Sequence, residues 1–139
     1  MAKKVINIEN YFSEKNEQDG VWHEPIIDGN PIGIELLVMG IHSDFATNEM
    51  IRIGLESANV EKSDLSKDEK NKKLEELDAE RVAVLTKGIR AVDGSTLTYK
   101  GEKIKFTTEL MKELYLNSPD IKMEIANFVV KSSNFIIFD

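Results

Sequence analysis

The C-terminal third of the chain carries the start signals of two consecutive helices. Thr107 is placed to cap the first, because its hydroxyl can accept a hydrogen bond from a free backbone amide in the first helical turn. Asn117 ends that helix, and Ser118-Pro119 starts the second, since proline fixes φ at the first helical position. We therefore expect two short helices that end near Phe135.

Each of these helices has a single apolar face. In the first helix, side chains three and four residues apart form a face of Leu110, Met111, Leu114 and Tyr115. In the second helix, the same spacing gives a stripe of Ile121, Ile125, Phe128, Ser132 and Phe135. The pattern predicts a C-terminal helical hairpin packed in a core.

Turn residues predict two β-hairpins. Residues 21–41 alternate in character around Asp28-Gly29-Asn30-Pro31, which is a strong turn. Pro25 and the proline of the turn lack a backbone donor, so we expect the first strand to lie at a sheet edge. A smaller hairpin is expected after Asp93-Gly94, within residues 98–106, directly before the C-terminal helices.

Two longer helices are predicted between the hairpins. Ser43 precedes a helix over residues 44–60, and Ser66 with Glu69 forms a capping box for a second helix. We expect this second helix to carry an apolar row of Leu74, Leu77, Arg81, Val84, Leu85 and Gly88. Its first three turns are too polar to be buried, so they are expected in solvent or beside a partner subunit.

Residues 1–20 are expected to form a flexible N-terminal arm that ends in a polar linker over residues 13–20. Val5-Ile6-Asn7-Ile8 fits either an edge strand or a segment that packs on a neighbouring subunit, and both remain open. Residues 21–139 are expected to form a single domain. The predicted class is α+β, mainly helical: an N-terminal β-hairpin, about four helices, and a second small hairpin before the C-terminal helix pair.

Composition bounds the possible partners. The 139 residues include no cysteine, which leaves no thiol nucleophile, disulfide framework or cysteine metal site. The net charge of -7 argues against binding to nucleic-acid backbones, whose affinity depends on Lys and Arg. No apolar run approaches the roughly 20 residues that a membrane helix needs, so no membrane partner is expected.

Catalytic motifs are also missing. The two histidines, His23 and His42, are far apart in sequence and do not suggest a zinc site. No glycine-rich phosphate loop and no nucleophile elbow occur, and no pair of carboxylates is marked as an acid–base couple. We therefore expect a binding or assembly protein without catalytic residues, cofactor or metal.

One cluster of large apolar residues would be unfavourable if it were exposed to water. The chain ends with the large apolar residues Phe135, Ile136, Ile137 and Phe138 before Asp139. Exposed, they would favour aggregation, so they are expected either to tuck under the domain or to cover a partner. Together with the helical residues Leu110 and Leu114, they are the candidate residues for partner binding or self-association.

The order of these signals resembles the tail assembly chaperones of long-tailed bacteriophages and prophages. The resemblance covers roughly residues 20–136. It rests on the stretches Ile89–Gly94 and Lys103–Glu109, on Ser118-Pro119-Asp120-Ile121, and on the apolar spacing of the last helix. Each of these stretches taken alone is a turn signal or a helix-cap signal, and it is their order along the chain that resembles the family. A tryptophan common at the end of the family's long helix is absent here, where Ile89 or Val92 stands.

The resemblance implies a non-catalytic protein of the host cell cytoplasm. Such chaperones bind the long tape measure protein, keep it soluble, help to recruit tail tube subunits, and are absent from the finished virion. A homo-oligomer is expected. Three rivals remain: a virion component such as a head–tail connector or tail terminator subunit, an acidic DNA mimic, and an enzyme. The mixed charge of residues 67–73 counts against the DNA mimic.

Overall fold

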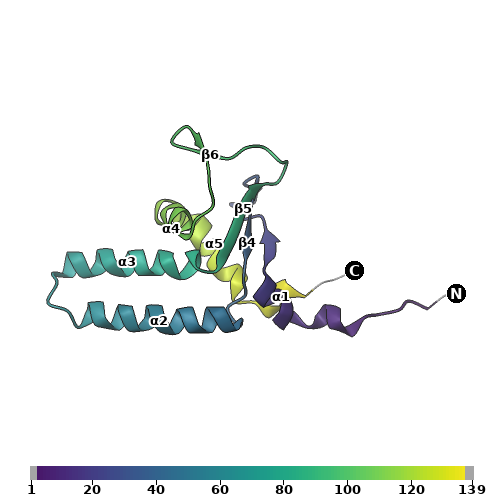
Figure 1. Cartoon of the computed structure of the whole chain (residues 1–139), viewed down its shortest axis with the longest axis horizontal. Coiled ribbons are helices and arrows are strands. Elements are labelled where there is room, and N and C mark those ends of the chain that lie inside the picture. Colours follow the sequence, from purple (N-terminus) through teal and green to yellow (C-terminus); the bar gives the residue numbers. More distant parts are fainter. Residues whose placement is uncertain (1–2, 137–139) are drawn as a thin grey trace.

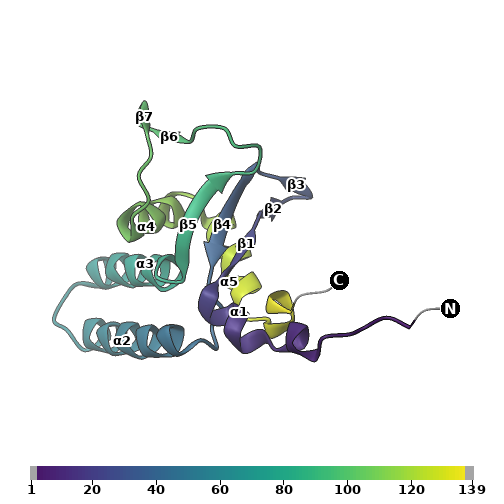
Figure 2. The ribbon, with the colours of Figure 1, turned by 45° about the vertical axis from the view of Figure 1, so that its right-hand side comes forward.

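The computed structural model describes residues 3–136 and shows an α+β protein, which confirms the predicted class (Figure 1). A small antiparallel sheet stands at the centre of the molecule. Two long helices project from one end of this sheet, and an irregular excursion with a small hairpin rises from the other (Figures 1 and 2). The N-terminal segment leads away from the body on the side opposite to the long helices.

The sheet has three strands in the order β1-β4-β5, with both pairs antiparallel. These strands are β1 (Val21–His23), β4 (Ile34–Val38) and β5 (Thr86–Ala91). One face presents Leu36 and Val38, which are buried in the hydrophobic core. The opposite face carries Trp22, and the Arg90 guanidinium lies 3.8 Å from the centre of its ring. The sheet therefore has one packed face and one face open to solvent.

The predicted N-terminal hairpin is present. β1 pairs with β4, and a two-residue extension pairs β2 (Ile26–Ile27) with β3 (Asn30–Pro31). Asp28 and Gly29 both have positive φ, 52° and 80°, as a tight two-residue hairpin turn requires. β1 is an edge strand, as its neighbouring proline predicted.

The strand β5 was not predicted. The helix expected to reach Gly88 ends at Ala83, because the chain turns there and pairs with β4. Gly88 belongs to this strand and lets the Trp22 ring approach, since a Cβ at this position would lie 3.1 Å from that ring. The prediction was wrong because a short apolar run fits a buried strand as well as a helix end.

The two long helices form an antiparallel pair, α2 (Asp44–Glu61) and α3 (Lys67–Ala83) (Figure 1). Ser43 caps α2 by accepting a hydrogen bond from the Ala46 amide at 3.2 Å. Ser66 caps α3 in the same way, with the Glu69 amide at 3.2 Å, and its hydroxyl donates to the Glu69 carboxylate. Both predicted caps are confirmed.

The core lies between the packed face of the sheet, α3 and the C-terminal pair α4 (Thr108–Asn117) and α5 (Pro119–Val129). Thr107 caps α4 as predicted, by accepting from the Leu110 amide at 3.0 Å. A buried hydrogen bond of 2.7 Å joins the Tyr115 hydroxyl to the Thr86 hydroxyl. This bond ties Thr86, the first residue of strand β5, to the middle of α4.

The last predicted helix is shorter than expected. α5 ends at Val129, and residues Ser132–Phe135 form a separate 3-10 turn, η2. The Asn134 side-chain amide donates to the Phe128 carbonyl at 2.8 Å, which folds the chain back against the end of α5. This reversal, and not a continuous helix, brings the Phe135 side chain into the core.

The polar linker predicted over residues 13–20 is instead the short helix α1 (Ser13–Asp19). α1 packs against η2, where the Asn16 side-chain amide donates to the Phe135 carbonyl at 2.7 Å. Its Glu17 side chain is buried, and one carboxylate oxygen has no hydrogen-bond partner among the described residues. Before α1 lies a 3-10 turn, η1 (Ile8–Tyr11), so the edge strand considered for residues 5–8 does not form.

Gly40 and Gly54 form a matched pair for a stability test. A Cβ at Gly40 would lie 2.7 Å from the Glu17 Cβ, whereas a Cβ at Gly54 on α2 meets no atom within 4 Å. We expect Gly40→Ala to lower the free energy of unfolding by roughly 1–3 kcal/mol, because α1 must move. We expect Gly54→Ala to raise it by about 0.5–1 kcal/mol, since alanine favours the helix. Urea denaturation of both variants shows whether the free energy of unfolding falls for the first and rises for the second.

Burial raises the pKa of the Tyr115 phenol above its ordinary value of 10.0, and the Thr86 hydrogen bond opposes this only in part. The folded state thus favours the neutral phenol, so stability is full below about pH 10 and falls as the pH rises further. Between pH 8 and about pH 10.5 we expect the wild-type chain to lose about 1 kcal/mol of unfolding free energy more than Tyr115→Phe. If urea denaturation shows that both proteins lose the same unfolding free energy over this pH range, the raised pKa of Tyr115 is contradicted.

Candidate binding groove

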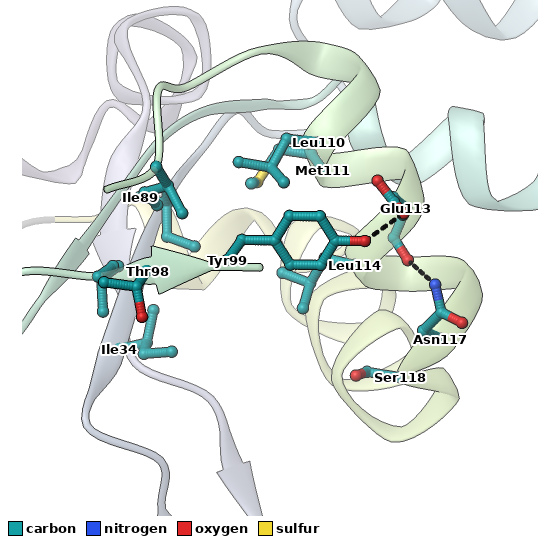
Figure 3. A pocket seen from close by; sticks show the side chains of 12 residues that line it. Ile34, Ile89, Thr98, Tyr99, Leu110, Met111, Glu113, Leu114, Asn117 and Ser118 are labelled. Atoms are coloured by element: carbon teal, nitrogen blue, oxygen red, sulfur yellow. Dashed lines mark hydrogen bonds between the residues drawn. The ribbon is translucent and has the colours of Figure 1, made fainter. Parts of the chain in front are cut away.

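An apolar groove of about 460 Å³ lies at the upper end of the sheet (Figure 3). Its three walls are the sheet, helix α4, and the excursion of residues 92–107 that joins β5 to α4. The excursion contains the predicted small hairpin, β6 (Thr98–Tyr99) paired with β7 (Glu102–Lys103). The groove is therefore built from three parts of the chain that lie far apart in sequence.

The floor of the groove comes from the sheet and α4. Ile34 and Ile89 lie on the packed face of the sheet and line the groove, and Ile89 also packs against the core. Leu110 and Leu114 are one helical turn apart on α4, and both line the groove while also packing against the core. These two leucines were candidate binding residues from the sequence, and their role in binding remains a prediction.

The roof of the groove is the excursion. Its hairpin turns at Lys100 and Gly101, whose φ values of 53° and 80° suit a two-residue turn. The Ile104 amide donates to the Leu97 carbonyl at 3.0 Å, which extends the hairpin toward the sheet. The side chains of both residues line the groove, and neither belongs to the core cluster. Both side chains are half-buried, so each keeps some surface that a ligand in the groove can contact.

One polar link closes the groove at the far side. The Tyr99 hydroxyl donates to the Glu113 carboxylate, so the ring reaches from the hairpin across to α4 (Figure 3). This hydrogen bond raises the pKa of Tyr99 and is the largest cause of that shift. The Asn117 side chain donates to the Glu113 carbonyl at 2.8 Å. The groove thus offers an apolar floor with a few polar groups at its rim, which is typical of a binding site.

Phe135 and Ile136, the C-terminal candidate residues that the structure describes, do not line this groove. Phe135 is only 1% exposed and packs near Phe128, with the ring centres 5.7 Å apart. We therefore correct its assignment from partner binding to core, because η2 turns its side chain inward. Ile136 is half-buried, and Ile137 and Phe138 lie outside the described residues.

The groove residues that the sequence did not mark as binding candidates include Ile34, Ile89, Leu97 and Ile104. Ile34 was placed on a strand, but its position beside α4 depends on the unpredicted strand β5. Leu97 and Ile104 flank the observed hairpin strands β6 and β7, and their apolar character next to a charged turn was an available signal. The sheet residues carried no comparable local signal.

His23 pairs with an acid on a neighbouring element. His23 Nε2 lies 2.8 Å from the Glu124 carboxylate, and its ring stacks on Phe128 at 3.8 Å between centres. This pair joins β1 to α5, which is a structural role. Within residues 3–136, no three His, Cys, Asp or Glu side chains are grouped to hold a metal ion.

No helix in the described part of the chain is both long and apolar enough to cross a bilayer. No protein-family model, curated protein or solved structure matches the chain.

The groove should bind an apolar probe such as an anilinonaphthalene sulfonate dye. Leu97→Asp and Ile104→Asp each place a charge against the apolar floor, and we expect about tenfold weaker dye binding from each. Leu116→Asp is the matched control, because Leu116 is exposed on α4 and does not line the groove. Dye fluorescence titration measures the difference. Equal affinity in all three variants would show that the dye binds elsewhere.

Proposed function

We propose that the chain is a non-catalytic tail assembly chaperone of a long-tailed bacteriophage or prophage. In this role it binds the tape measure protein, keeps it soluble, and helps to recruit tail tube subunits in the host cell cytoplasm. The observation that carries the proposal is the apolar groove roofed by the excursion of residues 92–107. The choice of this family rests on the resemblance in the order of turns and helix caps along the sequence.

A groove of this kind suits a helical client. A client that is long, helical and rich in apolar side chains aggregates unless those side chains are covered. An apolar helix can place side chains one turn apart into a groove floored by Ile89, Leu110 and Leu114. The groove holds a few side chains only, so several copies of the chaperone would be needed along one client.

The surface chemistry supports the same role. The net charge of -7 favours solubility of a complex that contains an apolar client. Tyr99 and Glu113 close one side of the groove through a single hydrogen bond between exposed groups, so the hairpin can move aside as a client enters. Such a site binds many related apolar segments with moderate affinity, as a chaperone requires.

A virion component, such as a head–tail connector or tail terminator subunit, is the second candidate. Helix α2 favours it, because Ile51 and Leu55 lie one turn apart and are 59% and 63% exposed. A permanent subunit buries such a stripe against its neighbours. Mass spectrometry of purified virions separates the two roles, since a chaperone leaves the particle.

The test is co-expression of this chain with the neighbouring long, helix-rich reading frame. We expect the long protein to be soluble, and to co-elute on size exclusion with light scattering, only when the wild-type chain is present. Leu97→Asp/Ile104→Asp should reduce the soluble fraction at least about tenfold, because charge in the groove opposes apolar contacts. Leu116→Asp should behave as the wild type.

If the long protein stays insoluble with the wild-type chain, the chaperone role is rejected. If Leu97→Asp/Ile104→Asp still solubilises it, the chaperone role holds but the groove is not the client site. Circular dichroism of each purified variant shows whether it is folded, which separates loss of binding from loss of structure.

A further inference from the structure

The N-terminal segment exposes apolar side chains that the rest of the chain does not cover. Val5 is 98% exposed, and Ile6 and Ile8 are each 67% exposed. Lys3 and Lys4 precede them, so this arm, residues 3–8, is a basic apolar segment on an acidic chain. Residues 3–7 have no regular secondary structure. Such a segment is free to adopt the shape of a binding site.

The arm and the groove lie on opposite sides of one molecule. In Figures 1 and 2 the arm leads away from the body beside α1, while the excursion that roofs the groove rises on the other side of the sheet. The arm therefore points away from the groove of its own chain. A second copy can bring its groove to the arm, and only Ile8, the first residue of η1, has to leave its 3-10 turn to become extended.

We propose that the arm of one copy binds in the groove of a second copy. The proposal uses the groove named above as the client site, but self-association can be measured with no client present. It commits to residues 3–8 as the segment bound and to the floor of Ile89, Leu110 and Leu114 as its receptor. A client would compete with the arm for the same floor.

The strand β5 gives the bound arm a place to pair. β5 is an edge strand of the three-stranded sheet, and its residue Ile89 lines the groove. The Val92 amide donates to the Gly33 carbonyl, so alternate residues of β5 point their backbone groups toward β4 and Ile89 points its own outward. An extended arm can add to this edge as a further strand.

The side-chain pattern of the arm fits that pairing. In an extended chain Ile6 and Ile8 lie on one side and Asn7 on the other. A strand added at β5 can therefore direct both isoleucines onto the apolar floor while Asn7 faces solvent. Glu113 is the acidic residue among those that line the groove, so it can attract the two lysines at the start of the arm.

The size of the contact sets the strength of the association. An arm of six residues buries less than the roughly 1,200 Å² at which specific stable interfaces begin. The association is therefore weak and reversible, and it can yield to a client that fills more of the groove. Because the arm and the groove are different surfaces, the contact is head-to-tail and builds chains or closed rings of more than two copies.

The first measurement is the light-scattering mass of the wild-type chain from roughly 10 µM to 1 mM, the range of a weak complex. We expect the mass to rise with concentration beyond that of a dimer. Ile6→Asp/Ile8→Asp, which alters the arm, and Leu97→Asp/Ile104→Asp, which alters the groove, should each remain monomeric. Ile51→Asp/Leu55→Asp removes the exposed stripe on α2 and should associate as the wild type does.

Mixing the two monomeric variants gives the decisive result. Each variant retains the surface that the other lacks, so their mixture should form a complex of one copy of each and grow no further. Hydrogen exchange at the Ile89 amide should slow in this mixture, because that amide gains a partner. These readouts need no client, so they are independent of the co-expression test.

Several results would overturn the proposal. The proposal is wrong if the wild-type chain stays monomeric over the whole concentration range. It is also wrong if the arm variant associates as strongly as the wild type. Loss of association in Ile51→Asp/Leu55→Asp alone would move the interface to α2. A mixture of the arm and groove variants that remains monomeric would show that the two surfaces do not bind each other.

Discussion

The pairing of β5 with β4 is the constraint on which the rest of the structure depends. It returns the chain to the sheet after the long helical pair, in a register that places Ile89 opposite Leu36. The buried hydrogen bond from Tyr115 to Thr86 then fixes α4 against the start of the same strand. Without this strand, the sheet would be a two-stranded hairpin, and such hairpins are only marginally stable alone.

The same pairing creates the groove. β5 ends at Ala91, and the chain must travel from there to the start of α4 at Thr108. The intervening residues arch over the end of the sheet, because α4 is held against the core by Met111 and Tyr115, which are both buried. Leu97 and Ile104 cover part of the space below and leave the rest open. The groove is thus a consequence of where two secondary-structure elements are anchored.

The position of helix α1 depends on contacts with the turn η2, near the other end of the described chain. α1 packs on η2, and the Asn16 side chain holds the Phe135 backbone at 2.7 Å. Gly40 permits this packing because the Glu17 side chain occupies the space that a Cβ would need. Residues near both ends of the described chain are therefore joined, and the arm that precedes α1 leaves the body from a fixed point.

Local chemistry determined the elements whose signals lie within a few residues of one another. The caps at Ser43, Ser66 and Thr107 and the turns at Asp28-Gly29 and Lys100-Gly101 follow from side-chain hydrogen bonding and backbone φ preferences alone. The amphipathic face of α4 likewise follows from helical spacing, and it located Leu110 and Leu114 before their surroundings were known.

Only the tertiary structure decided the state of β5, α1 and Phe135. The run from Val84 to Ala91 is compatible with helix or strand, and pairing with β4 selects strand because it satisfies the backbone hydrogen bonds of both. The polar sequence of α1 becomes a helix against η2, although its composition alone suggested a linker. Phe135 faces the core at η2, where the Asn134 side chain bonds the Phe128 carbonyl and the Asn16 side chain bonds the Phe135 carbonyl. These outcomes depend on contacts between residues far apart in sequence, which periodicity and propensity do not encode.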